Sequence, residues 1–373
     1  MKNKILIPFS KPFQLDYDVV EKKLSKVLKN SKWSKGEYLE EFERACEKYL
    51  GVKYAVAVSS CTSGLMLVLA SLNKPGEVLL PGFAFPAVAN AVVWNGLKPV
   101  FVDVEPVYGN IDPIQVEKHI SKKTVAILPV CNYGFPPDFD KLQKISKKYE
   151  VPLIIDSAQS FGTSFKGKKC GGFGIAEVFS LSPSKIITSG EGGVVTTNNK
   201  KMADFLRMGR NYGKSENELF QFAGLSSRLS EFHAVTGIEM LKNIKQILRS
   251  RTSIAKKYYE ELEGCPGISL PLLTSYVKPS FNFFVAYLHG RRSKNIRDRV
   301  LKELQVSGIE ARKLFSPPIY KHPAFKCYVP AGFSLKNCEK LASQCLTLPL
   351  YPGMNYRDVM RVCRVIKKTL RSY

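Results

Sequence analysis

The chain has 373 residues, 45% of them hydrophobic, which is enough for one large α/β domain and a smaller second one. Its nine cysteines are scattered without a CxxC pair and there are only four histidines, so we expect reduced thiols and neither a disulfide framework nor a metal site. No apolar run has the length of a membrane span, and Pro8 interrupts the basic start before a signal-peptide core could form. These features predict a soluble, cytoplasmic protein.

The net charge of +24, from 56 Lys and Arg against 32 Asp and Glu, raises the possibility of nucleic-acid binding. The basic residues are spread as short clusters, mostly at helical spacing, and no aromatic and basic module of an RNA-binding type is present. We therefore interpret the charge as a lysine-rich solvated surface and expect neither nucleic acid nor membrane as a partner. Such a surface would also attract a phosphorylated or nucleotide-linked substrate.

Strand-like and helix-like patterns alternate from Tyr54 to Asn198. Seven β-prone runs are expected as strands, at 54–60, 77–83, 98–104, 124–130, 151–158, 177–182 and 193–198. Helical patterns separate the first of them, at 63–73, 86–96, 112–120 and 138–150. Continuously apolar strands linked by helices predict an α/β domain with a mainly parallel seven-stranded sheet, covered on both faces.

The pattern changes after about residue 245, where long charged helical stretches surround a few strands. This change predicts a smaller α+β C-terminal domain. We expect the large domain to span 13–245 and the smaller one 246–373, with residues 1–12 joining the smaller domain.

Ligands of parallel sheets bind beyond the carboxyl ends of the strands, which draws attention to four stretches of the chain. These stretches are 59–63, 83–85, 156–159 and 180–185. In the first, small hydroxyl residues stand where a strand runs into a helix. Free backbone N–H groups at such a helix start would suit a phosphate, but for this stretch taken alone plain N-capping by Ser60 or Thr62 is the favoured interpretation.

Two charged residues stand at the ends of apolar strands. Asp156 ends the run LIID, where a buried carboxylate needs a cation or strong donors, although helix capping is an alternative. Lys185 lies between two expected strands and should point inward. A phosphate cradle, a buried aspartate and a buried lysine together match the requirements of pyridoxal 5′-phosphate: the lysine for a Schiff base, the aspartate for a protonated ring nitrogen, and Phe85 for the ring face.

With these residues in view, the sequence resembles the DegT/DnrJ/EryC1/StrS family of sugar aminotransferases, which are fold type I pyridoxal-phosphate enzymes. The most specific motif is Ser180, followed five positions later by Lys185 and then by Gly-Glu-Gly-Gly at 190–193. The resemblance runs nearly end to end, through the stretches 7–12, 33–43, 54–65, 81–92, 98–106, 132–142, 156–174, 179–198, 210–213, 226–237, 308–325 and 346–354.

The resemblance implies a role for each matching residue. Lys185 would be catalytic and would carry the cofactor and move a proton, and Asp156 would pair with the ring nitrogen. Gln159 would contact the ring hydroxyl, and Phe85 would stack on the ring face. The phosphate would be bound by Ser180, Thr62 and Ser63. The resemblance also implies a homodimer with shared active sites, in which Ser226 would contact the cofactor phosphate of the partner subunit.

Four positions depart from the family pattern. Cys61 replaces a common glycine before Thr62, Ser226 stands where asparagine is frequent, and Cys131 with Asn132 replaces a usual Val-His. The catalytic set is retained.

The implied activity is amino transfer from glutamate to a nucleotide-linked keto-sugar, for glycan, lipopolysaccharide or antibiotic sugar synthesis. There are two alternatives. The enzyme could act on a keto-sugar without a nucleotide, or the chain could be a regulatory protein that binds the cofactor without turnover.

Overall fold

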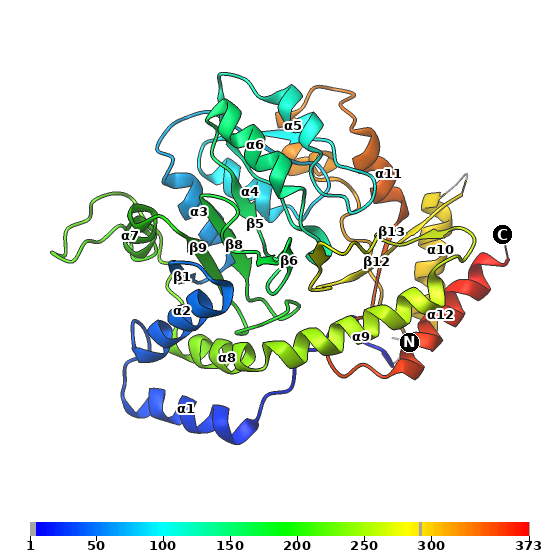
Figure 1. Cartoon of the computed structure of the whole chain (residues 1–373), viewed down its shortest axis with the longest axis horizontal. Coiled ribbons are helices and arrows are strands. Elements are labelled where there is room, and N and C mark those ends of the chain that lie inside the picture. The colour runs from blue at the N-terminus through cyan, green and yellow to red at the C-terminus, as the bar shows by residue number, and fades with distance from the viewer. Residues whose placement is uncertain (1–4, 291–292, 373) are drawn as a thin grey trace.

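A seven-stranded sheet forms the centre of the computed structural model, which describes residues 5–290 and 293–372 (Figure 1). Hydrogen-bonded ladders join the strands in two groups, β1-β9-β8-β5 and β3-β2-β4. Parallel bridges Ile127–Leu153 and Val130–Asp156 connect the two groups through β4 and β5. The strands are β1 (Tyr54–Val58), β2 (Glu77–Pro81), β3 (Lys98–Val102), β4 (Thr124–Ile127), β5 (Ile154–Asp156), β8 (Ala176–Ser180) and β9 (Gly193–Thr197).

The sheet is parallel except at β9. Strand β2 pairs in parallel with β3 and β4, and β5 pairs in parallel with β8. Strand β9 runs antiparallel to both of its neighbours, β1 and β8. The expected mainly parallel sheet of seven strands is thus confirmed.

Alternate side chains of each central strand enter two different cores. Val56 and Val58 of β1 belong to one core, while Ala55 and Ala57 belong to the other. In β8, Val178 and its neighbour Phe179 divide in the same way. Because both faces of each strand are buried, the strands read as continuous apolar runs in the sequence.

Helices cover both faces of the sheet (Figure 1). Helices α3 (Cys61–Ala70), α4 (Ala87–Trp94) and α7 (Lys200–Gly209) supply residues to the first core. The second core includes residues of α2 (Glu37–Leu50), α5 (Pro113–His119), α6 (Phe139–Tyr149) and α8 (Glu231–Lys242), and α1 (Tyr17–Lys29) packs beside α8.

The C-terminal part is built around the antiparallel sheet β10-β12-β13. Its elements are α9 (Ile244–Leu262), β10 (Ile268–Ser269), β12 (Phe284–Leu288), α10 (Ser293–Val306), α11 (Lys336–Gln344), β13 (Cys345–Leu348) and α12 (Tyr356–Leu370). A small third sheet combines β11 (Val277–Lys278), β6 (Ser164–Phe165) and β7 (Lys168–Lys169), and short 3₁₀ helices span Asn132–Gly134, Ile319–Lys321 and Pro323–Tyr328.

The N-terminal segment lies against the C-terminal part of the chain. Ile7 forms a parallel bridge with Ile309, and the Phe9 amide donates to the Glu310 carboxylate at 2.8 Å. The Phe9 ring stacks on that of Phe283 at 5.3 Å. These contacts support the proposed grouping of residues 1–12 with 246–373; residues 1–4 of that range lie outside the described residues, and the domain division itself stays a prediction.

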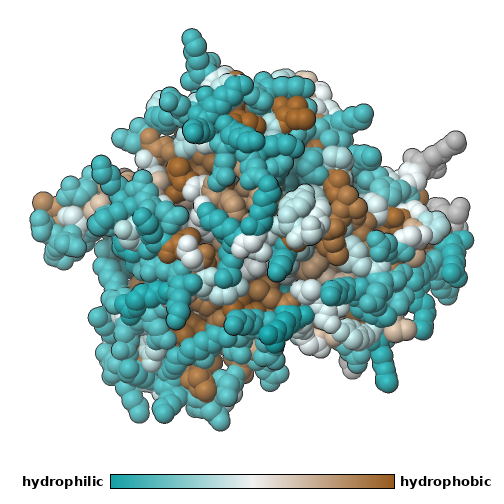
Figure 2. Space-filling view, in the orientation of Figure 1, coloured by the Kyte–Doolittle hydropathy of each residue, from teal (hydrophilic) through white to brown (hydrophobic). Residues whose placement is uncertain are grey.

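Hydrophilic residues cover most of the face seen in Figure 2, and hydrophobic residues show mainly in its hollows. Lysines on the outer helices form many surface ion pairs, such as Lys148 with Glu117 at 2.7 Å. Across residues 5–290 and 293–372, no helix combines the length and apolar character needed to cross a membrane.

Candidate active site

A cavity of about 400 Å³ opens at the carboxyl edge of the central sheet. All four stretches singled out at the strand ends contribute to its lining. The lining residues from these stretches are Ser60, Cys61, Thr62, Phe85, Asp156, Ala158, Gln159, Ser180, Ser182, Ser184 and Lys185. The sheet thus brings together residues that lie more than one hundred positions apart in the sequence.

The start of α3 forms one wall of the cavity. Ser60 is the N-cap: its hydroxyl accepts a hydrogen bond from the Ser63 amide at 3.0 Å, and the Ser63 hydroxyl completes a capping box. The Ser63 side chain is therefore engaged in the cap, while Thr62 lines the cavity. Capping by Ser60 is thus confirmed. The phosphate site stays a prediction, which the cap does not oppose, because a capped helix still presents its positive N-terminal end to an anion.

Glycine at position 193 lets β9 approach the start of α3. A Cβ atom on Gly193 would lie 2.7 Å from the Cys61 amide nitrogen and 2.8 Å from the Ser60 carbonyl oxygen. Backbone atoms cannot swing aside as a side chain does. The last glycine of the Gly-Glu-Gly-Gly motif is therefore required by this close packing.

Asp156 ends β5 with its side chain in the cavity wall. Its Oδ1 accepts a hydrogen bond from the Ala158 amide at 2.9 Å. Burial raises the pKa of Asp156 to about 6, and the Ala158 hydrogen bond and the positive charge of Lys185 oppose this rise. Asp156 therefore favours a cationic ligand group, which would offset the cost of its buried charge.

Lys185 lies in the connection between β8 and β9 and lines the same cavity. Its Nζ atom is 5.7 Å from the centre of the Phe283 ring. Burial lowers the pKa of Lys185, while Cys61 and Asp156 raise it to a smaller extent. The lowered pKa increases the fraction of neutral amine, which is the nucleophilic form.

Gln159 is held in one orientation. Its Oε1 accepts the Tyr133 amide at 2.9 Å, and the residue is buried in the cavity wall. The side-chain NH₂ group is thus left to donate toward the cavity. Tyr133 itself has a positive φ of 58°, in the left-handed region that non-glycine residues rarely adopt.

Two further predicted residues line the cavity. The Ser180 hydroxyl lies 3.3 Å from that of Ser182, so two hydroxyl groups meet at the end of β8. Phe85 precedes α4 and is 60% exposed although it lines the cavity. An exposed aromatic face at this place is available for stacking on a planar ligand.

Ser226 does not line this cavity. Its side chain forms a hydrogen bond with Tyr212, which, together with Arg228, lowers the pKa of that tyrosine. The adjacent Ser227 carbonyl accepts the Ser59 amide at 2.7 Å, so this segment runs beside the end of β1.

The C-terminal part contributes lining residues that sequence reasoning missed. They are Phe283, Arg312, Leu314 and Phe315. Arg312 packs with its guanidinium carbon 4.5 Å from the centre of the Phe9 ring. It lies in an irregular segment, so no periodic pattern marked it; its place in the stretch 308–325, already part of the resemblance, was the available signal.

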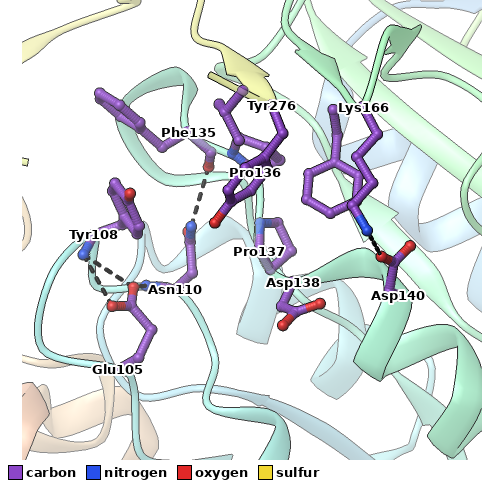
Figure 3. A pocket seen from close by; sticks show the side chains of 12 residues that line it. Glu105, Tyr108, Asn110, Phe135, Pro136, Pro137, Asp138, Asp140, Lys166 and Tyr276 are labelled. Atoms are coloured by element: carbon purple, nitrogen blue, oxygen red, sulfur yellow. Dashed lines mark hydrogen bonds and ion pairs between the residues drawn. The ribbon is translucent and has the colours of Figure 1, made fainter. Parts of the chain in front are cut away.

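Figure 3 shows a second hollow, with a volume of about 510 Å³. It is lined by Glu105, Tyr108, Asn110, Phe135, Pro136, Pro137, Asp138, Asp140, Phe165, Lys166, Tyr276 and Val277. The Asn110 amide donates to the Phe135 carbonyl at 3.2 Å, and Lys166 pairs with Asp140. None of the predicted site residues lines it, and the turn 132–135 lies between it and Gln159.

Comparison with known proteins identifies the family of the chain. The model of the DegT/DnrJ/EryC1/StrS aminotransferase family matches residues 17–367. The chain belongs to this family. It is 32% identical to the GDP-perosamine synthase of Caulobacter vibrioides, over 90% of this chain and 91% of that protein. It is 31% identical to the dTDP-3-amino-3,4,6-trideoxy-alpha-D-glucose transaminase of Streptomyces venezuelae, over 92% of this chain and 90% of that protein.

A solved structure shows the same fold. The crystal structure of DesI in the presence of its TDP-sugar product superposes with a TM-score of 0.92 at 27% identity, over 100% of this chain and 94% of that one. The chain is thus a fold type I sugar aminotransferase, as the sequence predicted. Within the described residues there is no group of three or more His, Cys, Asp or Glu side chains that could hold a metal ion.

Proposed function

We propose that this aminotransferase uses pyridoxal 5′-phosphate to move an amino group from glutamate to a nucleotide-linked keto-sugar. The observation that carries the proposal is that Lys185 and Asp156 line one cavity at the carboxyl edge of the sheet. When bound, the cofactor supplies an aldehyde that takes up amino groups and a ring that accepts electrons.

The residues of the cavity fit this cofactor. Asp156 needs a cationic partner, and a protonated ring nitrogen is one. The free NH₂ group of Gln159 would donate to the ring hydroxyl, and Phe85 would stack on the ring. The start of α3 with Thr62, backed by Ser63 and joined by Ser180, would bind the phosphate.

Lys185 would perform the proton transfer. Its lowered pKa leaves more of the amine neutral, so it can accept a proton from the α-carbon of glutamate. In the second half-reaction it would return a proton to the sugar carbon that receives the amine.

Arg312 is our candidate for binding an anionic group of the substrates. It lines the cavity from the C-terminal part, and its fork of N–H donors suits a carboxylate or phosphate. The similar enzymes named above act on GDP- and dTDP-linked sugars, which supports a nucleotide-linked substrate without selecting the nucleotide.

We further propose a cytoplasmic homodimer in which residues 224–230 of each subunit reach the cofactor phosphate of the other. The placement of Ser226 outside the cavity of its own chain supports this arrangement. With Ser226 in place of asparagine, one hydroxyl supplies the contact.

The proposed function is tested by adding glutamate to the cofactor-loaded protein and following absorbance, then adding keto-sugars with and without a nucleotide and analysing products by mass. Conversion of the cofactor to its amine form by glutamate is expected for the wild type. Lys185→Ala should bind the cofactor but show no multiple turnover, because the proton carrier is missing. Turnover by this variant without an added amine would contradict the assignment.

A further inference from the structure

Cys61 places a thiol beside the cofactor-facing carboxylate of Asp156. It is the first residue of α3 and lines the cavity. Its Sγ atom lies 4.0 Å from Asp156 Oδ1 and 3.8 Å from the Val178 carbonyl oxygen, both within the range of sulfur hydrogen bonds.

The surroundings keep this thiol protonated. Burial and the nearby charge of Asp156 raise the pKa of Cys61, while the charge of Lys185 lowers it to a smaller extent. The other charged residues that line the cavity are Glu191 and Arg312. A protonated thiol donates a hydrogen bond, so Cys61 acts toward the carboxylate as a donor.

The two donors on Asp156 converge on one oxygen. Oδ1 accepts the Ala158 amide and lies within reach of the Cys61 thiol. The other oxygen, Oδ2, is thereby left to face the cavity. This arrangement sets the rotation of the carboxylate before a ligand binds.

We propose that Cys61 is a positioning residue that orients Asp156 toward the ring nitrogen of the cofactor and that lies against the edge of the bound ring. This inference rests on the proposed function, since it requires that pyridoxal 5′-phosphate occupy the cavity. It adds one residue to the expected set of cofactor contacts.

The first test is alkylation of the wild-type protein by iodoacetamide at pH 9, with and without saturating pyridoxal 5′-phosphate, read for each cysteine by mass spectrometry over times long enough for the small thiolate fraction of Cys61 to react in the cofactor-free sample. Cys61 should react about tenfold more slowly when the cofactor is bound, because the ring covers the thiol. Cys327 is exposed and should react equally in both samples, so it serves as the internal control.

The outcomes separate this inference from the proposed function. Cofactor binding seen by absorbance, with no protection of Cys61, would overturn the inference alone. A protein that does not take up pyridoxal 5′-phosphate would overturn the proposed function and the inference together.

The second test compares Cys61→Ser, which keeps a donor, with Cys61→Ala, which removes it. The dissociation constant of pyridoxal 5′-phosphate should rise about two- to fivefold in the alanine variant and stay within about twofold in the serine variant, as expected for loss of one weak hydrogen bond. The pH midpoint of the bound-cofactor absorbance should shift in the alanine variant alone. Cys327→Ala is the matched control, and circular dichroism checks folding. Equal behaviour of the serine and alanine variants would refute the positioning role.

Discussion

Asp156 carries a buried negative charge that the apoprotein tolerates at a cost. Its pKa in the fold is raised from 3.8 to about 6. Since the folded-state value lies above the unfolded one, the ionised carboxylate destabilises the fold above pH 6. This loss in the free energy of unfolding disappears as the pH falls through 6 toward 3.8, because protonation removes the charge. Folding stability therefore gives no reason for a carboxylate here, whereas the proposed contact with the ring nitrogen of the cofactor does.

Asp156→Asn should therefore stabilise the apoprotein at pH 8 while impairing catalysis. We expect a gain of about 1 to 3 kcal/mol in the free energy of unfolding at pH 8 and almost none at pH 4. Denaturant unfolding at the two pH values measures this. The variant should still bind pyridoxal 5′-phosphate but lose most activity, because a neutral amide cannot hold the proton on the ring nitrogen. Wild-type turnover would show that Asp156 is only a helix cap.

At the level of single residues, the sequence placed Asp156, Lys185, Gln159 and Thr62 at strand ends, and the structure brings them to one cavity. It could not place Ser226 relative to the cavity, because that depends on how a loop distant from the strand ends returns to β1. Arg312 was not predicted to line the cavity, because an irregular segment shows no hydrophobic periodicity in its sequence. The catalytic roles of all of them stay predictions.

Among the elements, the packing of α3 on the sheet depends on two glycines. Gly64 faces the Val178 and Val195 side chains, where a Cβ atom would lie 2.8 and 2.9 Å from their methyl groups. Gly193 faces the backbone at the start of α3. The helix therefore lies close to the strands, and its first turn sits near the ends of β8 and β9.

Gly193→Ala should push α3 away from β9. The added methyl group meets backbone atoms, so we expect a loss of about 1 to 3 kcal/mol in the free energy of unfolding, together with weaker cofactor binding. Gly172→Ala is the matched control, because its nearest neighbour is the Asn198 side chain at 3.2 Å and its φ is not positive. That change should cost less than about 0.5 kcal/mol. Equal losses in the two variants would contradict the packing argument.

The existence and order of the main strands and helices were predictable because each carries a strong period or a continuous apolar run. The direction of β9 was not, since an antiparallel strand buried on both faces has the same apolar composition as a parallel one. The small sheet of β6, β7 and β11 was missed because each strand has only two residues, too few to show alternation.

For the whole molecule, the proposed shared site makes cofactor retention depend on assembly. Diluting the protein through its dimer dissociation range should release pyridoxal 5′-phosphate in step with the loss of dimer, because part of each phosphate site would leave with the partner. Absorbance and light scattering over the same concentrations measure the two processes. A monomer that keeps its cofactor and full activity would rule out sharing.

The packing of residues 7–9 against the C-terminal part also affects the order in which the chain folds during synthesis. Phe9 and its acceptor Glu310 are separated by 301 positions. A ribosome adding roughly 5 to 20 residues per second needs about 15 to 60 s to cover that distance. Ile7 and Phe9, both almost fully buried in the finished fold, stay without their partners during this time. Phe9 is thus buried only after the segment around residue 310 has been synthesised, and the cavity wall at Arg312, which packs on Phe9, is completed no earlier.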